Sequence, residues 1–204
     1  MKRTTNIVRL AGAIALGMLF GNNAAAQTQL AYMATGAATS QPIGHYEFCQ
    51  ALPAECAVRS PAPVTVALNE ALWARLVQVN AAVNTSIAPT TDREMFGRDE
   101  VWSYPTTRGD CEDYVLLKRR MLIDAGWPPS ALLITVVRKA NGEGHAVLTV
   151  RTDRGDFVLD NLSGDIALWS AAPYTFLKRQ SEFDSGRWVA IDGGMNAPII
   201  MVGG

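Results

Sequence analysis

Three residues of this chain have the types and the order of a nucleophile, a base and an orienting acid. Cys111 follows Gly109-Asp110 at the start of a predicted helix, His145 opens a predicted strand, and Asp160 lies on the next strand. A helix N-terminus stabilises a thiolate through its dipole and unpaired N–H groups, which can also receive an oxyanion. The pattern therefore predicts a thiol nucleophile, with a structural cysteine and a surface histidine as the alternative interpretations.

A predicted β-hairpin must bring His145 and Asp160 together. Strand-like residues on both sides of a turn at residues 152–155 indicate the hairpin. If its loop has an even number of residues, position 145 lies opposite position 162, and Asp160 falls on the face of His145, within reach of the ring. A three-residue loop would place the two side chains on opposite faces. The hypothesis of a Cys-His-Asp triad therefore depends on this register.

The spacing of apolar residues predicts helices followed by antiparallel strands. The helices are expected over residues 64–86 and 111–125, with a long loop over residues 88–109 between them. The predicted strands cover residues 132–138, 145–151, 156–161 and 187–192. In the second helix, we expect Lys118 and Arg119 to face solvent. This order of elements predicts an α+β fold, with the nucleophile at a helix N-terminus packed on an antiparallel sheet.

Three blocks of the sequence resemble the signature blocks of the bacterial transglutaminase-like cysteine proteinases. The blocks are Arg108-Gly109-Asp110-Cys111-Glu112-Asp113-Tyr114, Gly144-His145-Ala146-Val147-Leu148 and Phe157-Val158-Leu159-Asp160-Asn161. They follow one another in the family's order and spacing, and the similarity extends over most of residues 64–170. The resemblance implies a papain-like, transglutaminase-like fold in which Cys111, His145 and Asp160 are nucleophile, base and orienting acid.

The resemblance also implies a thiol peptidase that cleaves protein substrates. The chain is similar to the branch of the family that releases adhesins from the cell surface in the periplasm and controls biofilm dispersal. The expected partners are therefore a surface adhesin as substrate and an inner-membrane regulator. The same triad would also serve a protein acyltransferase of the transglutaminase type. A non-catalytic, calcium-dependent binding module on the same scaffold is a third interpretation.

Three acidic residues, Asp110, Glu112 and Asp113, surround the candidate nucleophile. Their charges oppose formation of a thiolate. One interpretation is structural, because acidic residues favour the first turn of a helix and Asp110 with Asp113 resembles a capping box. The other is a bound calcium ion, which takes carboxylate oxygens and would cancel the charge. The resemblance implies Asp110 and Glu112 as calcium ligands, with Asp113 as a further candidate.

The N-terminus and the other two cysteines indicate export. Residues 1–26 combine basic residues, a short apolar stretch and small residues at a cleavage site near Ala26, as in a signal peptide; a membrane anchor is the alternative. Outside the cytoplasm, Cys49 and Cys56 are expected to pair within an extended segment over residues 27–63, although two unrelated buried thiols would also fit the sequence. Cys111 is then the unpaired thiol of a periplasmic protein.

Length and charge limit the remaining possibilities. A mature chain of this length suits one core, which we expect over residues 64–204. The formal net charge of −1 and the lack of a basic run after the signal give no argument for nucleic acid. We therefore expect a monomer that acts on a protein.

Overall fold

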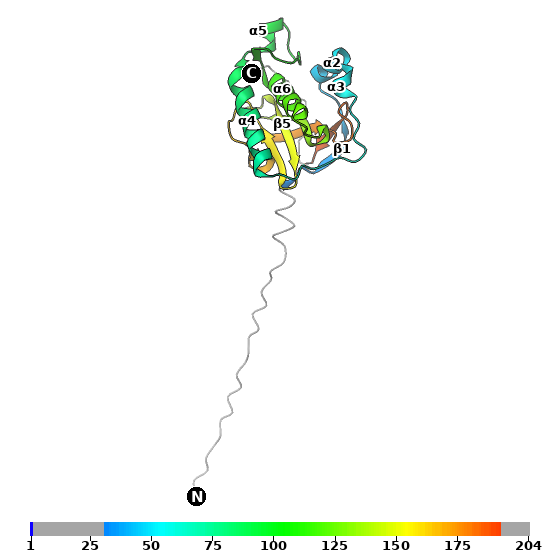
Figure 1. The fold of residues 1–204 in the computed structure, drawn as a ribbon. Coiled ribbons are helices and arrows are strands. Elements are labelled where there is room, and N and C mark those ends of the chain that lie inside the picture. Colours follow the sequence, from blue (N-terminus) through cyan, green and yellow to red (C-terminus); the bar gives the residue numbers. More distant parts are fainter. Residues whose placement is uncertain (2–30, 193–204) are drawn as a thin grey trace.

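The computed structural model describes Met1 and residues 31–192, and its centre is a seven-stranded antiparallel sheet (Figure 1). The strands are β1 (Thr35–Thr39), β4 (Leu132–Arg138), β5 (Gly144–Thr152), β6 (Gly155–Leu159), β7 (Ala167–Leu168), β8 (Thr175–Gln180) and β9 (Trp188–Ile191). They lie in the order β1-β9-β8-β4-β5-β6-β7, and every neighbouring pair is antiparallel. The first and the last strands of the described chain therefore pair with each other.

Helices cover one face of this sheet. The α-helices are α2 (Ile43–Ala51), α3 (Pro53–Cys56), α4 (Glu70–Ser86), α5 (Asp92–Phe96) and α6 (Cys111–Asp124), with 3-10 turns η1 (Pro129–Ala131) and η2 (Trp169–Ala171). Helix α6 packs across β4 and β5, and α4 lies beside it (Figure 1). A short parallel pair, β2 (Ala88–Pro89) and β3 (Arg108–Gly109), joins the end of α4 to the start of α6. The expected α+β fold is confirmed.

The alternation of side chains along β5 divides the core into two layers. Ala146, Leu148 and Val150 face the helices and join the larger apolar cluster, whereas Val147 faces the other side of the sheet with a smaller one. Each of these four side chains is fully buried.

Helix α6 is confirmed, but the expectation that Lys118 and Arg119 face solvent is wrong. Their side chains are 0% and 4% exposed, because α4 flanks the helix and the sheet lies beneath it. The Arg119 Nε–H donates to the carbonyl of Leu132 at 2.9 Å. Lys118 Nζ has no hydrogen-bond partner among the described residues and lies 6.0 Å from the centre of the Tyr114 ring. Burial lowers the pKa of Lys118 to about 7.

The first helix is shorter than predicted. It begins at Glu70, because the side chain of Asn69 accepts the backbone N–H of Leu72 and caps it. Before that cap, Val66 pairs with the end of β5, so the preceding residues are extended. The expected loop over residues 88–109 contains α5, which Thr91 starts with a capping box.

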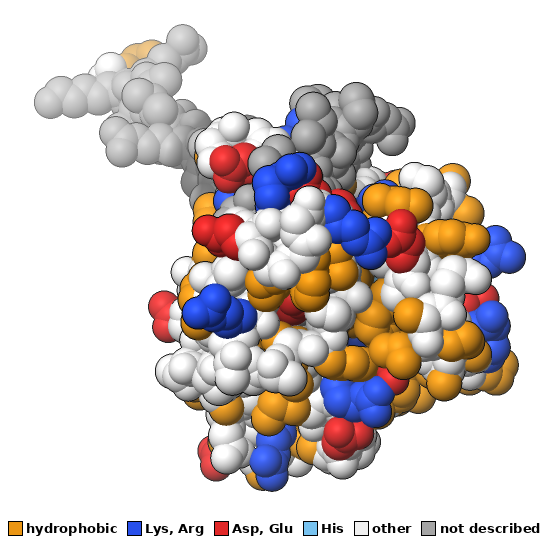
Figure 2. All heavy atoms as spheres, turned by 90° about the horizontal axis from the view of Figure 1, so that it is seen from above, with side chains coloured by type: hydrophobic (Ala, Val, Ile, Leu, Met, Phe, Trp, Pro, Cys, Tyr) orange, Lys and Arg blue, Asp and Glu red, His pale blue; other side chains and the backbone are white. Residues whose placement is uncertain are grey.

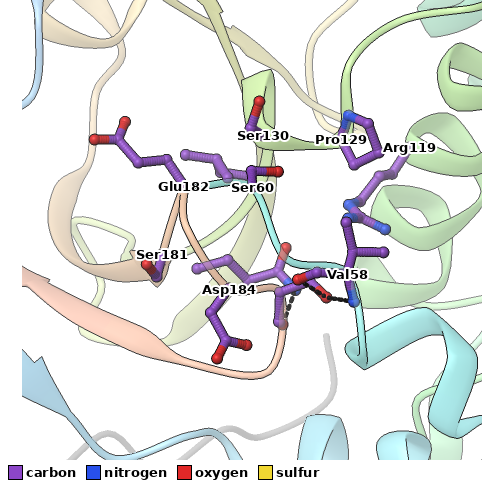
Figure 3. A pocket seen from close by; sticks show the side chains of 11 residues that line it. Val58, Ser60, Arg119, Pro129, Ser130, Ser181, Glu182 and Asp184 are labelled. Carbon is purple, nitrogen blue, oxygen red and sulfur yellow. Dashed lines mark hydrogen bonds between the residues drawn. The ribbon is translucent and has the colours of Figure 1, made fainter. Parts of the chain in front are cut away.

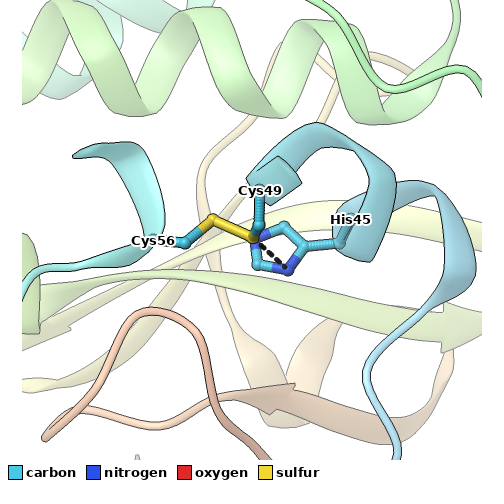
Figure 4. Close-up of side chains that lie close together, drawn as sticks. All are labelled: His45, Cys49 and Cys56. Atoms are coloured by element: carbon cyan, nitrogen blue, oxygen red, sulfur yellow. Dashed lines mark hydrogen bonds between the residues drawn. A yellow bond between two sulfur atoms is a disulfide. The ribbon is translucent and has the colours of Figure 1, made fainter. Parts of the chain in front are cut away.

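The N-terminal segment is part of the fold. It contributes strand β1 to the sheet edge and helices α2 and α3 to the helical layer, where only extended chain was expected. The predicted Cys49–Cys56 disulfide is present. Figure 4 shows the His45 ring against this bond, with Nδ1 3.6 Å from Cys49 Sγ. The same Nδ1 accepts the indole N–H of Trp188, and burial lowers the pKa of His45 to about 3.

The predicted signal peptide and its alternative, a membrane anchor, concern residues that the structure describes only at Met1. The expected signal peptide, residues 1–26, lies outside the described residues except for Met1. Within residues 31–192, no helix combines the length and the apolar character that crossing a bilayer requires. The domain boundary expected at residue 64 stays a prediction.

Removing the disulfide should destabilise the protein without affecting the candidate nucleophile. Closure of a loop this short predicts that Cys49→Ala with Cys56→Ala lowers the free energy of unfolding by about 2 kcal/mol. Urea unfolding measures this difference, with Cys111→Ala as the control that leaves the disulfide intact. An unchanged midpoint in the double variant would contradict a stabilising role for the bond.

Candidate active site

The β5–β6 hairpin has the register that the triad hypothesis requires. Thr152 pairs with Gly155 across a two-residue turn, and Leu148 pairs with Leu159. The loop is therefore even-numbered, and His145 and Asp160 lie on the same face. Their side chains are joined by a hydrogen bond of 2.8 Å between Nε2 and Oδ1. His145 Nδ1 is then the ring nitrogen that remains to exchange a proton with a nucleophile.

Asp160 is buried, and donors surround its carboxylate. Oδ1 accepts the backbone N–H of Leu162 at 3.0 Å in addition to the bond with His145, and Oδ2 accepts the hydroxyl of Tyr174 at 2.5 Å. Burial alone would raise the pKa of Asp160, but these hydrogen bonds and the charge of His145 outweigh it and hold the pKa below its ordinary value. Asp160 is thus a carboxylate that can orient the imidazole.

Cys111 occupies the first position of α6, as predicted. Its half-buried thiol donates to Glu112 Oε2 at 3.1 Å. Burial raises the pKa of Cys111 well above its ordinary value, and the charges of Glu112 and Asp110 add to the rise. In this environment the thiol is protonated, so its activation requires a base and some compensation of the neighbouring charge.

A cluster of three aspartates lies beside the start of α6. Oxygen atoms of Asp92, Asp110 and Asp113 all lie within 4.8 Å of one another, and the three side chains are buried. One oxygen of each, Asp92 Oδ1, Asp110 Oδ1 and Asp113 Oδ2, has no hydrogen-bond partner among the described residues. The cluster thus includes Asp110 and Asp113, two of the expected ligands. The third, Glu112, has its carboxylate at the Cys111 thiol.

Sequence patterns did not indicate Asp92, and of the two interpretations of Asp110 the capping box with Asp113 is wrong. Asp92 is brought to the cluster by α5, a helix that was not expected. Asp110 is the N-cap residue of α6, but its side chain makes no capping hydrogen bond, so the suggested capping box with Asp113 is absent. Asp113 Oδ1 instead accepts the backbone N–H of Ser103 at 2.8 Å.

Burial disfavours the ionised form of the carboxyl groups in the cluster and of Glu100, on which the charge of Asp110 acts. Burial, followed in each case by neighbouring negative charge, raises the pKa of Asp110 to about 6 and that of Glu100 to about 7. Burial likewise raises the pKa of Asp113 to about 8, although the Ser103 N–H opposes it. An all-oxygen set of this charge, with unpartnered oxygens, fits a hard cation such as calcium.

One loop segment connects the cluster to the disulfide region. The backbone N–H groups of Val101 and Ser103 donate to Asp92 and Asp113, respectively. Between them, Trp102 is buried and packs edge-on against His45, with ring centres 5.3 Å apart. The loop therefore places side chains in the core beneath α2 while its backbone supports the acidic residues.

Two concavities lie outside this site. A cavity of about 10 Å³, room for about one water, lies between Arg119 and the loop containing Ser181 and Asp184 (Figure 3). An open groove of about 340 Å³ lies beside the N-terminus of α4, with Trp73 and Phe157 in its wall. Neither concavity contains the candidate triad, so the predicted chemistry lies elsewhere.

On the face seen in Figure 2, basic side chains are interspersed with acidic, apolar and uncharged ones.

A thiol at a helix N-terminus, packed on an antiparallel sheet that carries a His–Asp pair, is the arrangement of papain-like cysteine hydrolases. The family model described as bacterial transglutaminase-like cysteine proteinase matches residues 35–196. The chain belongs to this family of cysteine proteinases. No curated protein matches the chain.

Solved structures of Legionella pneumophila LapG are similar to this chain. One is 27% identical over 53% of this chain and 63% of its own length, with a TM-score of 0.47. An EGTA-treated structure is 26% identical over 58% and 67%, with a TM-score of 0.49. A calcium-bound structure is 21% identical over 65% and 75%, with a TM-score of 0.50, and it supports the fold. The chain thus spans somewhat less than two thirds of the first of these proteins.

The Asp113 carboxyl should make stability depend on pH in calcium-free buffer. Its pKa rises from 3.8 to about 8 on folding, so the folded protein holds this proton more tightly than the unfolded chain. The stability that the proton provides is present in full below pH 4 and is lost as the pH rises to about 8. Wild type should therefore lose stability relative to Asp113→Asn over this range.

Urea unfolding at several pH values measures this effect. Asparagine keeps an acceptor for the Ser103 N–H and remains neutral, so it imitates the protonated acid. Asp165→Asn, at an exposed position, is the matched control and should run parallel to wild type. Parallel curves for Asp113→Asn and wild type would contradict the raised pKa.

Proposed function

We propose that this chain is an exported thiol peptidase in which Cys111, His145 and Asp160 form the catalytic triad. The observation that carries the proposal is the 2.8 Å bond between His145 Nε2 and Asp160 Oδ1, in a hairpin whose strand β5 packs against α6, the helix that begins at Cys111. This arrangement leaves His145 Nδ1 for the nucleophile. It also fixes the imidazole through a buried, ionised carboxylate.

The residues divide the reaction among them as follows. Cys111 Sγ attacks the peptide carbonyl carbon while its proton passes to His145, and the oxyanion is received by backbone N–H groups at the start of α6. The protonated imidazole then gives the proton to the leaving amine, which departs as the C–N bond breaks. Water, deprotonated by His145, hydrolyses the thioester and releases the second product. Asp160 stays ionised and holds the ring throughout.

We propose further that calcium binds beside the nucleophile. Asp92, Asp110 and Asp113 would hold it, and Glu112 lies next to them at the thiol. Their unpartnered oxygens and raised pKa values support a hard cation, as does the calcium-bound form of a LapG with the same fold. When bound, calcium would cancel the negative charge that raises the pKa of Cys111.

The family and the cysteines support the proposed substrate and compartment. Membership of a proteinase family supports a protein substrate, and similarity to LapG makes a surface adhesin our candidate. We propose a monomer in the periplasm, with residues 1–26 as signal, residues 27–63 as the disulfide-containing segment and residues 64–204 as the peptidase domain. An inner-membrane protein would act as regulator.

Alkylation of the thiol tests the triad. With calcium present at pH 6, iodoacetamide should label Cys111 rapidly in wild type, and at least tenfold more slowly in His145→Ala, which lacks the base. Mass spectrometry locates the adduct. Equal inertness of wild type and variant would exclude an activated nucleophile and favour a binding module.

The fate of the acyl group separates peptidase from acyltransferase. Cell-surface and periplasmic proteins from strains that carry wild type or Cys111→Ala are compared by electrophoresis. The proposal expects a protein that is shortened by wild type and stays intact with the variant. Cross-linked species that depend on Cys111, in place of fragments, would identify an acyltransferase.

Calcium should raise the thermal stability of wild type through the aspartate cluster. At a hundredfold excess over Kd, ligand binding predicts a rise in Tm of about 5–10 °C for a protein of this size. Asp92→Asn should remove most of this rise, because Asp92 is a proposed ligand. Asp165→Asn, at an exposed position, should retain it. The calcium site is wrong if wild type shows no rise, or if the two variants respond equally.

A further inference from the structure

Tyr174 connects to the proposed triad through both its hydroxyl and its ring. The hydroxyl donates to Asp160 Oδ2 at 2.5 Å, on the carboxylate oxygen that His145 does not use. The ring of Tyr174 lies against that of His145, with centres 5.5 Å apart and a tilt of 55°. One side chain therefore contacts the acid and the base together.

The second oxygen of Asp160 depends on this contact. Oδ1 has two donors, His145 and the backbone of Leu162, whereas Tyr174 is the only hydrogen-bond donor to Oδ2 within residues 31–192. The residue is 3% exposed, so water cannot easily replace a lost donor. Without the hydroxyl, the carboxylate is free to rotate away from the geometry in which Oδ1 faces the imidazole.

We propose that Tyr174 is a positioning residue, which fixes the Asp160 carboxylate against His145 and covers their hydrogen bond from solvent. The proposal rests on the triad of the proposed function. Tyr174 comes from the short connection between η2 and β8, an element outside the hairpin and α6. It therefore connects the His145–Asp160 pair to a segment outside both the β5–β6 hairpin and α6.

Other groups act on this pair from the neighbouring helices. On α6, burial lowers the pKa of Lys118, and the charge of Asp160 opposes that effect. On α4, Asn84 Nδ2 donates to the backbone carbonyl of Asp160 at 2.8 Å. These groups stay the same when the tyrosine hydroxyl alone is removed, so a Tyr174→Phe variant isolates its contribution.

The two histidines of the sequence make a spectroscopic test direct. In protein labelled with 15N-histidine, the ring N–H of His145 that bonds to Asp160 should give a slowly exchanging proton signal, assigned by its loss in His145→Ala. In Tyr174→Phe, we expect its exchange with water to be at least tenfold faster. The N–H of buried His45, in a separate part of the core, should be unchanged and serves as an internal reference.

Tyr114→Phe is the matched control, because it also removes a buried tyrosine hydroxyl. That hydroxyl donates to the carbonyl of Ile87 at 2.6 Å rather than to the triad. This variant should lose stability and leave both histidine signals in place. Exchange in Tyr174→Phe within twofold of wild type would overturn the proposal. So would equal acceleration of His145 and His45, which would indicate general loosening.

Kinetics on a cleaved substrate supply a second measurement. Tyr174→Phe should lower kcat about tenfold with KM unchanged, because the hydroxyl organises the base rather than the substrate. An equal loss through KM alone would also overturn the positioning role. If no substrate is cleaved by wild type, the peptidase proposal fails, and the exchange measurement still decides the role of Tyr174.

Discussion

Buried negative charge at the start of α6 is the constraint on which the rest of the site depends. Asp110 and Asp113 flank the candidate nucleophile, and α5 adds Asp92 to them in a volume that excludes water. Such a cluster is costly unless protons, donors or a cation compensate it. The surrounding loop supplies backbone N–H groups, but one oxygen of each carboxylate still lacks a partner among the described residues. Protons or the proposed cation would supply the remaining compensation.

At the His145–Asp160 pair, by contrast, the surroundings favour the ionised carboxylate. Asp160 is as buried as the aspartates of the cluster, yet its pKa lies below its ordinary value because donors from three directions meet it. The strands provide His145, the chain after β6 provides the Leu162 N–H, and the connection before β8 provides Tyr174. Burial raises the pKa of the carboxyl group in both places, and only at Asp160 do the hydrogen-bond donors and the charge of His145 outweigh it.

Local sequence was enough to predict what is local in the structure. Helix α6, the disulfide and the β5–β6 hairpin depend on residues close in sequence, so their patterns could be recognised, but the register of the hairpin stayed conditional on the length of its loop. Asp92 and Tyr174 could not be found in this way, because only tertiary packing brings α5 and the connection before β8 to the site. Lys118 was misjudged for the same reason, since periodicity shows which face of a helix is apolar but not how many neighbours cover it. Strands β1 and β8 have little alternation and were missed.

Under the proposed function, activation of Cys111 would need both the His145–Asp160 pair and a cation in the aspartate cluster. The proposed His–Asp pair would accept the proton, but burial raises the pKa of Cys111, and the charges of Glu112 and Asp110 add to the rise and work against its transfer. A dication among the aspartates would remove that opposition without touching the triad. The thiol would then ionise only when the cluster is filled, since the base alone acts against a larger electrostatic cost. Under the proposed function, the acidic cluster beside α6 would therefore control the reactivity of Cys111, while His145 and Asp160 on the strand side would supply the base and the orienting acid.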